Sequence, residues 1–92
     1  NYARELVLIG HYAEAVEIAE TGWQACVQYG QYYTLPATIA LIAECYHFLE
    51  EDDKSKIFYR QAYYLCQAIN DKGCLNTVVS EIQKYFGNDF SF

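Results

Sequence analysis

Apolar residues recur every three or four positions along most of the chain, and this spacing predicts helices. The clearest run covers residues 12–29. Its apolar stripe consists of Ala15, Ile18, Ala19, Gly22, Trp23 and Cys26, and its polar face of Glu14, Glu17, Glu20, Gln24 and Gln28. A glycine inside a helix costs up to about 1 kcal/mol relative to alanine. We therefore expect a neighbouring helix to pass close to Gly22.

The same spacing predicts four further helices. The five predicted helices cover residues 2–8, 12–29, 35–49, 53–69 and 75–86. The stripes of the last three consist of Ile39, Ile42, Ala43, Tyr46 and Leu49, then Ser55, Phe58, Tyr59, Ala62, Cys66 and Ile69, then Val78, Val79, Ile82 and Tyr85 or Phe86. Terminal signals agree with these limits: they are Gly10, Pro36, Asp52 or Asp53, and Gly87.

Short loops join the predicted helices, and short loops make consecutive helices antiparallel neighbours. The fold class is therefore all-α, with about five helices arranged as stacked antiparallel hairpins. At 92 residues, the chain forms a single domain, residues 1–92. The tail at 88–92 ends in two aromatic residues that pack back on the helices or engage a neighbour.

One pattern occurs twice, 40 residues apart. The segment that Gly10 opens and the segment that Glu51 opens both place small residues on the stripe of a following helix. These small residues are Ala15, Ala19 and Gly22, then Ser55 and Ala62. A repeated helical hairpin is a stacking unit, and stacked hairpins build binding surfaces rather than catalytic pockets.

These repeats resemble tetratricopeptide repeats over residues 2–86. The second repeat carries the family's pattern of small and aromatic residues at Ala43, Tyr46, Leu49, Ser55, Tyr59 and Ala62, with Glu50 in place of the usual turn glycine. The first repeat matches from its turn onward, at Gly10, Tyr12 and Ala15. The spacing of 40 exceeds the family's usual length of about 34 residues. Residues 1–35 form repeat one, with a truncated first helix, 36–73 form repeat two, and 74–92 a capping helix and tail.

Degenerate repeats with long helices are similar to the C-terminal halves of Gram-positive helix-turn-helix regulators of the XRE type. The strings that carry this likeness are 10–15, Leu35-Pro36, 60–65 and 84–87. The resemblance implies a cytoplasmic bacterial transcription regulator whose repeats dimerise or bind a signalling peptide, with DNA bound by a domain outside this chain. A shift between dimer arrangements would then transmit peptide binding. The alternatives are a scaffold segment of a larger helical-repeat protein and a purely structural homodimerisation domain.

In tetratricopeptide arrays the first helix of each hairpin lines the concave face. The resemblance places the candidate peptide- or partner-binding residues at Arg4, Val7, Ala40, Glu44, His47, Phe48 and Glu81. Arrays that clamp a peptide carboxylate use Lys and Asn where this chain has Ala40 and Glu44, so that clamp is absent. An apolar floor with Glu44 and His47 suits a hydrophobic peptide with a basic group. The alternative is that two repeats are too few for a groove and these residues pack on a neighbour.

The charge distribution argues against direct nucleic-acid contact by this segment. The net charge is −6, and residues 1–53 hold nine acids and one base, Arg4. A nucleic-acid surface needs a basic face. No apolar run approaches the ~20 residues of a membrane span, and the segment from Asn1 has no signal-peptide pattern. The expected partner is a peptide or protein, with a possible homodimer, and no membrane.

No catalytic, cofactor or metal motif is present in the sequence. There is no Gly-rich phosphate loop, no H-E-x-x-H and no nucleophile elbow, so we expect no enzyme and no cofactor. The four cysteines lack C-x-x-C spacing, and Cys26, Cys45 and Cys66 are interpreted as small core residues. Cys45 and His47 are two apart on a helix and point to different faces, so no metal site is expected. The ten tyrosines suit either a partner surface or a thin core.

Overall fold

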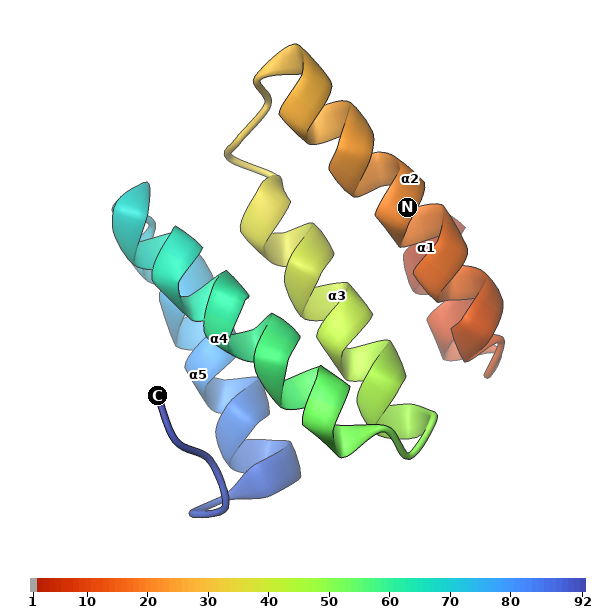
Figure 1. Cartoon of the computed structure of the whole chain (residues 1–92), viewed down its shortest axis with the longest axis vertical. Coiled ribbons are helices and arrows are strands. Elements are labelled where there is room, and N and C mark those ends of the chain that lie inside the picture. Colours follow the sequence, from red (N-terminus) through yellow and green to blue (C-terminus); the bar gives the residue numbers. More distant parts are fainter. Residues whose placement is uncertain (1) are drawn as a thin grey trace.

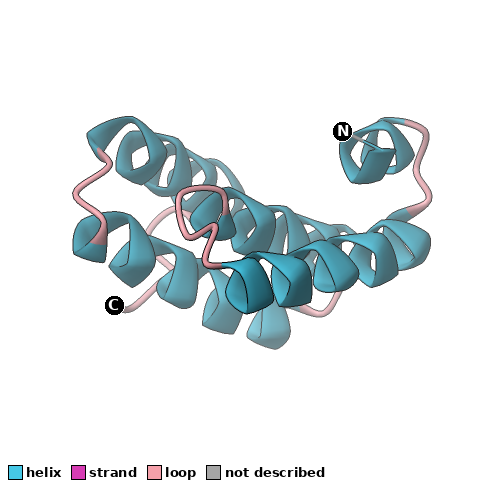
Figure 2. Ribbon diagram, turned by 90° about the horizontal axis from the view of Figure 1, so that it is seen from above, coloured by secondary structure: helices cyan, strands magenta, loops and turns pink. Residues whose placement is uncertain are grey.

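The fold is a stack of antiparallel helices. The computed structural model describes residues 2–92, and Asn1, where repeat one was expected to begin, lies outside them. The described residues form five helices and no strand: α1 (Tyr2–Leu8), α2 (Tyr12–Tyr29), α3 (Leu35–Phe48), α4 (Asp52–Ala68) and α5 (Lys72–Phe86). Consecutive helices run antiparallel, with α1 behind α2 and α5 behind α4 (Figure 1). The view from above places α1 and α5 on one side, with α3 between them (Figure 2). The predicted all-α hairpin stack is confirmed.

Helix α3 is the centre of the core. It is apolar on nearly all sides, which is the pattern of a helix with neighbours all round. One side packs on α4 and α5 through Leu35, Ile39, Ala40 and Ala43, and the other packs on α1 and α2 through Leu41, Ile42 and Cys45. The two core clusters therefore meet in one helix, and each hairpin is held through it.

The helix corners recur every 20 residues with the same backbone geometry. In each of four corners, one residue has a positive φ and donates its N–H to the carbonyl three residues earlier. The next N–H donates to the carbonyl five residues earlier, and these eight bonds measure between 2.8 and 3.4 Å. The four residues are Gly10, Gly30, Glu50 and Asn70, with φ of 84°, 71°, 63° and 57°. Glu50 and Asn70 occupy a conformation that favours glycine. The corner conformation is therefore the same in all four places, although the residue type is not.

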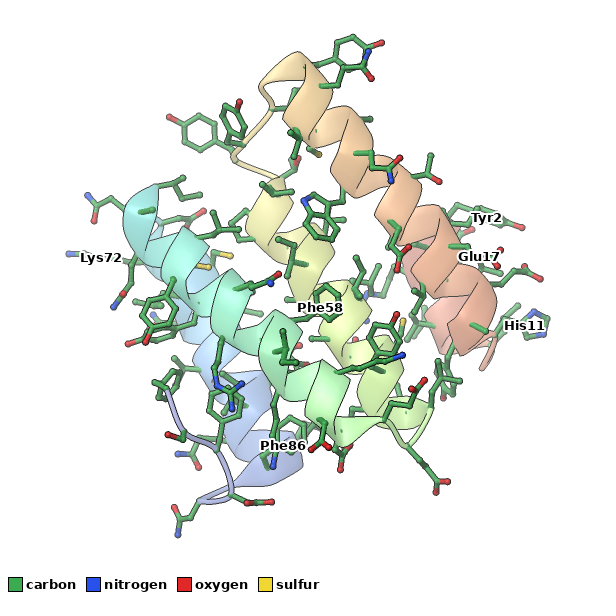
Figure 3. All side chains as sticks on the ribbon, viewed as in Figure 1. Tyr2, His11, Glu17, Phe58, Lys72 and Phe86 are labelled. Atoms are coloured by element: carbon green, nitrogen blue, oxygen red, sulfur yellow. The ribbon has the colours of Figure 1, made fainter. Side chains whose placement is uncertain are left out.

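Small residues on α4 let it approach α3 closely. Ser55 is fully buried, and its Oγ donates to the carbonyl oxygen of Ala43 at 2.6 Å. Ala62 is also fully buried, in the core cluster that α3, α4 and α5 share. Between them, Phe58 points toward α3 (Figure 3) and stacks on Tyr46 at a centroid distance of 5.5 Å. The small residues predicted for this stripe therefore lie at the helix contact.

The predicted stripe of α2 is partly wrong. Ala15, Ala19 and Cys26 are buried as expected, but Ile18 is 39% exposed and Val16 is buried in its place. Gly22 is exposed, and a Cβ added to it would meet no atom within 4 Å. No helix of the described residues therefore passes close to Gly22, and its expected packing role is not present.

The start of α5 also differs from the prediction. The helix begins at Lys72 rather than near residue 75, because the Asp71 carboxylate accepts the N–H of Cys74 at 3.0 Å and so caps the first turn. Gly73 belongs to the helix, not to the preceding loop. Helix α4 likewise begins one residue early, with Glu51 at its N-cap and no side-chain capping bond. Leu49 and Val79, which were predicted to lie on the apolar stripes of the third and fifth helices, are each 36% exposed rather than buried.

The C-terminal tail packs back on α4. The Phe92 ring lies 4.4 Å from that of Tyr63, and Arg60 Nε donates to the Ser91 carbonyl at 2.6 Å. Phe90 stacks on Phe86 at 6.0 Å. Of the two expectations for the tail, the structure shows contact with the helices.

Gly22→Ala is expected to stabilise the protein by up to about 1 kcal/mol, because the helical backbone accepts alanine and nothing obstructs its methyl group. Gly10→Ala is the matched control: its Cβ also meets no atom within 4 Å, but φ is +84°. That variant is expected to lose stability. Urea unfolding of both variants measures the change, and a destabilised Gly22→Ala variant would contradict the exposed position of this residue.

Candidate functional site

Three helices contribute one charged residue each to a row across the same face. Arg4 comes from α1, Glu44 from the middle of α3 and Glu81 from α5. Arg4 Nη1 donates to Glu44 Oε1 at 2.7 Å. Arg4 and Glu44 are 40 residues apart and hold equivalent places in their hairpins, whereas Glu81 lies three positions before the equivalent place on α5, which Lys84 occupies.

Two tyrosines hold the carboxylates of this row. The Tyr85 hydroxyl donates to Glu44 Oε2 at 2.5 Å, so both oxygens of Glu44 accept a bond. The Tyr59 hydroxyl donates to Glu81 Oε1 at 2.7 Å, and Tyr59 is fully buried. Glu44 is itself buried, and a buried carboxylate needs such partners. The two carboxylates of the row are therefore held in place by hydrogen bonds from Tyr59 of α4 and Tyr85 of α5.

The row carries more negative than positive charge, because it contains two carboxylates and one guanidinium. Burial raises the pKa of Glu81, and repulsion from Glu44 adds to it, while the bond from Tyr59 opposes the rise. Burial also raises the pKa of Tyr85, and so does its bond to Glu44. Burial lowers the pKa of Arg4, but its bond to Glu44 and the charges of Glu44 and Glu81 together outweigh burial, so the pKa is raised. Arg4 is hydrogen-bonded to Glu44 alone, and the charges of Arg4 and Lys84 both oppose the rise in the pKa of Glu81.

A pocket of about 240 Å³ opens beside this row. Its lining combines small and apolar side chains of α3 and α5 with the charged groups. The lining includes Ala37, Ala40, Leu41, Thr77, Val78 and Glu81. Arg4 lines it from α1, and Asp71 and Cys74 line it where α5 begins. The pocket is therefore made by three helices of the stack, α1, α3 and α5.

The structure brings most of the predicted site residues together. Arg4, Ala40 and Glu81 line the pocket, and Glu44 lies in the same row. His47 and Phe48 lie one turn further along α3, where their rings are 4.4 and 5.6 Å from that of Tyr85. Val7 instead is 7% exposed and packs in the core among α1, α2 and α3.

Sequence reasoning missed several residues of this site. Tyr59 was expected only as a core aromatic, and Tyr85 as part of an apolar stripe. The hydroxyl-to-carboxylate pairs join residues 22 and 41 positions apart. A buried tyrosine normally needs a partner for its hydroxyl, so the place of Tyr59 on a buried stripe indicates a polar partner nearby. Asp71 and Cys74 were missed because the start of α5 was placed too late.

A second hollow, of about 500 Å³, lies along α2 beside Trp23. The residues that line it are Glu20, Trp23, Gln24, Val27 and Gln28, all of one helix. A single helix cannot enclose a ligand, so this hollow is open surface. The pocket beside Glu81 is smaller but has walls on more than one helix, and it is the candidate site.

Glu81→Gln is expected to remove a pH dependence. The pKa of Glu81 is raised from 4.5 in the folded state, so the folded protein binds this proton more tightly than the unfolded chain. Stability from this group is therefore full below pH 4.5 and is lost as pH rises through the raised pKa. The side-chain carbonyl of the introduced glutamine can still accept from Tyr59. Thermal unfolding between acidic and neutral pH should show a smaller decline in the variant, and an equal decline would contradict the assignment.

Comparison with known proteins adds no relative. No family model, no curated protein and no solved structure matches the chain. Among residues 2–92, no group of three or more His, Cys, Asp or Glu side chains is placed to hold a metal ion. Within the same range, no helix has the length and apolar character needed to cross a membrane.

Proposed function

We propose that the chain is a peptide- or protein-binding module whose ligand lies on the face formed by α1, α3 and α5. The observation that carries the proposal is the Glu44–Glu81 pair beside a pocket with an apolar floor. Glu44 accepts a hydrogen bond from Arg4, whereas Glu81 has no such bond and only the charges of Arg4 and Lys84 act on it. The ligand is a segment that offers one basic side chain among apolar neighbours.

Charge supports a basic ligand group. Glu44 and Glu81 repel each other, and this repulsion contributes to the raised pKa of Glu81. Asp71 adds a third carboxylate at the far end of the pocket. A cation placed among these groups reduces the repulsion, and it favours the ionised form of Glu81. An anionic ligand in the pocket would meet the carboxylates of Asp71 and Glu81 and the one guanidinium of Arg4.

Size supports a peptide side chain rather than a small molecule. The pocket volume of about 240 Å³ lies below the roughly 300–1,000 Å³ of typical small-molecule sites. Phe48, which is 38% exposed, and the aromatic rings around it extend the face beyond the pocket. A peptide can place one side chain in the pocket and rest an apolar neighbour on these rings.

The kinship with tetratricopeptide repeats is part of the proposal. Its support is the helix corners, which recur every 20 residues and so return to an equivalent place after each 40-residue hairpin, and the small residues at the α3–α4 contact. The regulatory setting implied by that resemblance, and dimerisation, stay predictions. If the chain is instead a scaffold segment of a larger helical-repeat protein, the ligand would bind the same face. The two alternatives differ in the domains that adjoin this chain, which are further repeats in the scaffold and a DNA-binding domain in the regulator.

Selection from a random-peptide display library tests the proposed function. We expect enriched peptides to contain Lys or Arg beside apolar residues. Ala37 is exposed and lines the pocket, so Ala37→Trp should block it without disturbing the core. We expect that variant to bind the selected peptides at least about tenfold more weakly, a loss of about 1.4 kcal/mol.

The matched control is Ala25→Trp, which adds the same side chain at an exposed position of α2. It should bind like the unmodified protein. Equal affinity of the unmodified protein and Ala37→Trp, or enrichment of acidic peptides, would contradict the proposed site.

A further inference from the structure

Two cysteines meet where α4 ends and α5 begins. Cys66 lies in the last turn of α4 and Cys74 in the first turn of α5. Their sulfur atoms are 2.7 Å apart, and both residues are free thiols. Figure 3 shows two sulfur atoms side by side between these helices, near the labelled Lys72. The other two cysteines lie in separate places. Cys45 packs against α1 and α2, and the Cys26 sulfur is hydrogen-bonded to the Thr34 hydroxyl.

Asp71 holds the backbone on both sides of this thiol pair. Its N–H donates to the Cys66 carbonyl at 3.0 Å, and its carboxylate accepts the Cys74 N–H at 3.0 Å. The positive φ of Asn70 completes the tight corner. The two sulfur atoms are thus held close by a short, hydrogen-bonded connection, so joining them needs little movement of the chain.

The two thiols have different surroundings, which assigns their roles. Cys66 is fully buried, whereas Cys74 is partly exposed and lines the pocket of about 240 Å³. The Cys66 thiol donates its hydrogen to the Cys74 sulfur. Burial and this bond raise the pKa of Cys66 to about 12, which keeps its proton in place near neutral pH. Cys74 is therefore the thiol that a reagent reaches first.

We propose that Cys66 and Cys74 form a dithiol–disulfide site that reacts with low-molecular-weight disulfides. The Cys74 thiolate attacks one sulfur of the reagent R–S–S–R, forming a mixed disulfide and releasing R–S⁻. Cys66 then gives up its proton to solvent or to a thiolate, and its sulfur attacks Cys74 Sγ, which breaks the mixed bond and releases the second R–S⁻. The protein loses two electrons and two protons, and the reagent is reduced to two thiols.

The disulfide would cross-link the corner between the last two helices. Because Cys74 lines the pocket beside Glu81, a bond to Cys66 ties one wall of that pocket to α4. The inference stands on the thiol pair alone and does not depend on what the pocket binds.

The test treats the folded protein with glutathione disulfide, quenches the reaction with acid, and maps the thiols by alkylation and mass spectrometry. We expect loss of two of the four free thiols and one Cys66–Cys74 cross-link, with Cys26 and Cys45 alkylated only after unfolding. A mixed disulfide that remains on Cys74, or a cross-link between other cysteines, would overturn the proposal.

Single variants separate the two roles. Cys66→Ala should stop at the mixed disulfide on Cys74, and Cys74→Ala should leave Cys66 unreacted over the same time. Reaction of Cys66 in Cys74→Ala as fast as in the unmodified protein would contradict the assigned order. The helical circular dichroism of each variant checks its fold, and the experiment on the unmodified protein decides the proposal even where a variant unfolds.

Discussion

Ala62→Glu is expected to unfold the protein. Ala62 is fully buried in the core cluster that joins α3, α4 and α5. A glutamate there would bury a carboxylate among apolar side chains, at a cost of about 4 kcal/mol or more. Domains have a free energy of unfolding of about 5–15 kcal/mol, and short chains lie at the low end. Circular dichroism should show loss of most helical signal, or a large drop in Tm.

Gln61→Glu is the control for this result. It adds the same charge to the same helix at the preceding position, which is exposed. Its stability should stay within about 0.5 kcal/mol of the unmodified protein. A folded Ala62→Glu variant with near-normal Tm would mean that α4 is turned differently against α3.

Glu44→Lys is expected to produce the second largest loss, roughly 2–4 kcal/mol. Glu44 is buried and accepts bonds from Arg4 and Tyr85. Lysine accepts neither bond, and its charge lies against the Arg4 guanidinium. The loss should appear in denaturant unfolding, without any ligand present.

Two variants separate charge from position. Glu44→Gln keeps an oxygen acceptor in the same place, and its loss should be clearly smaller than that of Glu44→Lys. Glu17→Lys reverses a charge at an exposed site on α2 and should have little effect. Similar losses for all three would contradict the role of Glu44 as the centre of the row.

Helix periodicity was sufficient for the architecture. Five helices, their hairpin order and the buried positions of Ala43, Ser55 and Ala62 all follow from spacing and small residues. The details that failed were those decided by tertiary contact or by a local cap. Gly22 is exposed without a neighbour, and the Asp71 cap begins α5 a turn early.

Only part of the candidate site could be predicted from the sequence. The 40-residue spacing groups Arg4 with Glu44, whereas Glu81 was grouped with them as one of several positions on the fifth helix whose register the repeat does not fix. Hydrogen bonds between residues far apart in sequence have no periodic signal, and the Tyr59–Glu81 pair was therefore missed. The meeting of Cys66 and Cys74 depends on the geometry of one corner, which spacing alone does not give.

The most direct test of the proposed binding face is an amide chemical-shift map of the protein titrated with a selected basic peptide. We expect the largest changes at Ala37, Ala40, Thr77 and Glu81, on helices α3 and α5, with smaller changes at Arg4. Changes confined to the outer surfaces of α2 and α4 would contradict it.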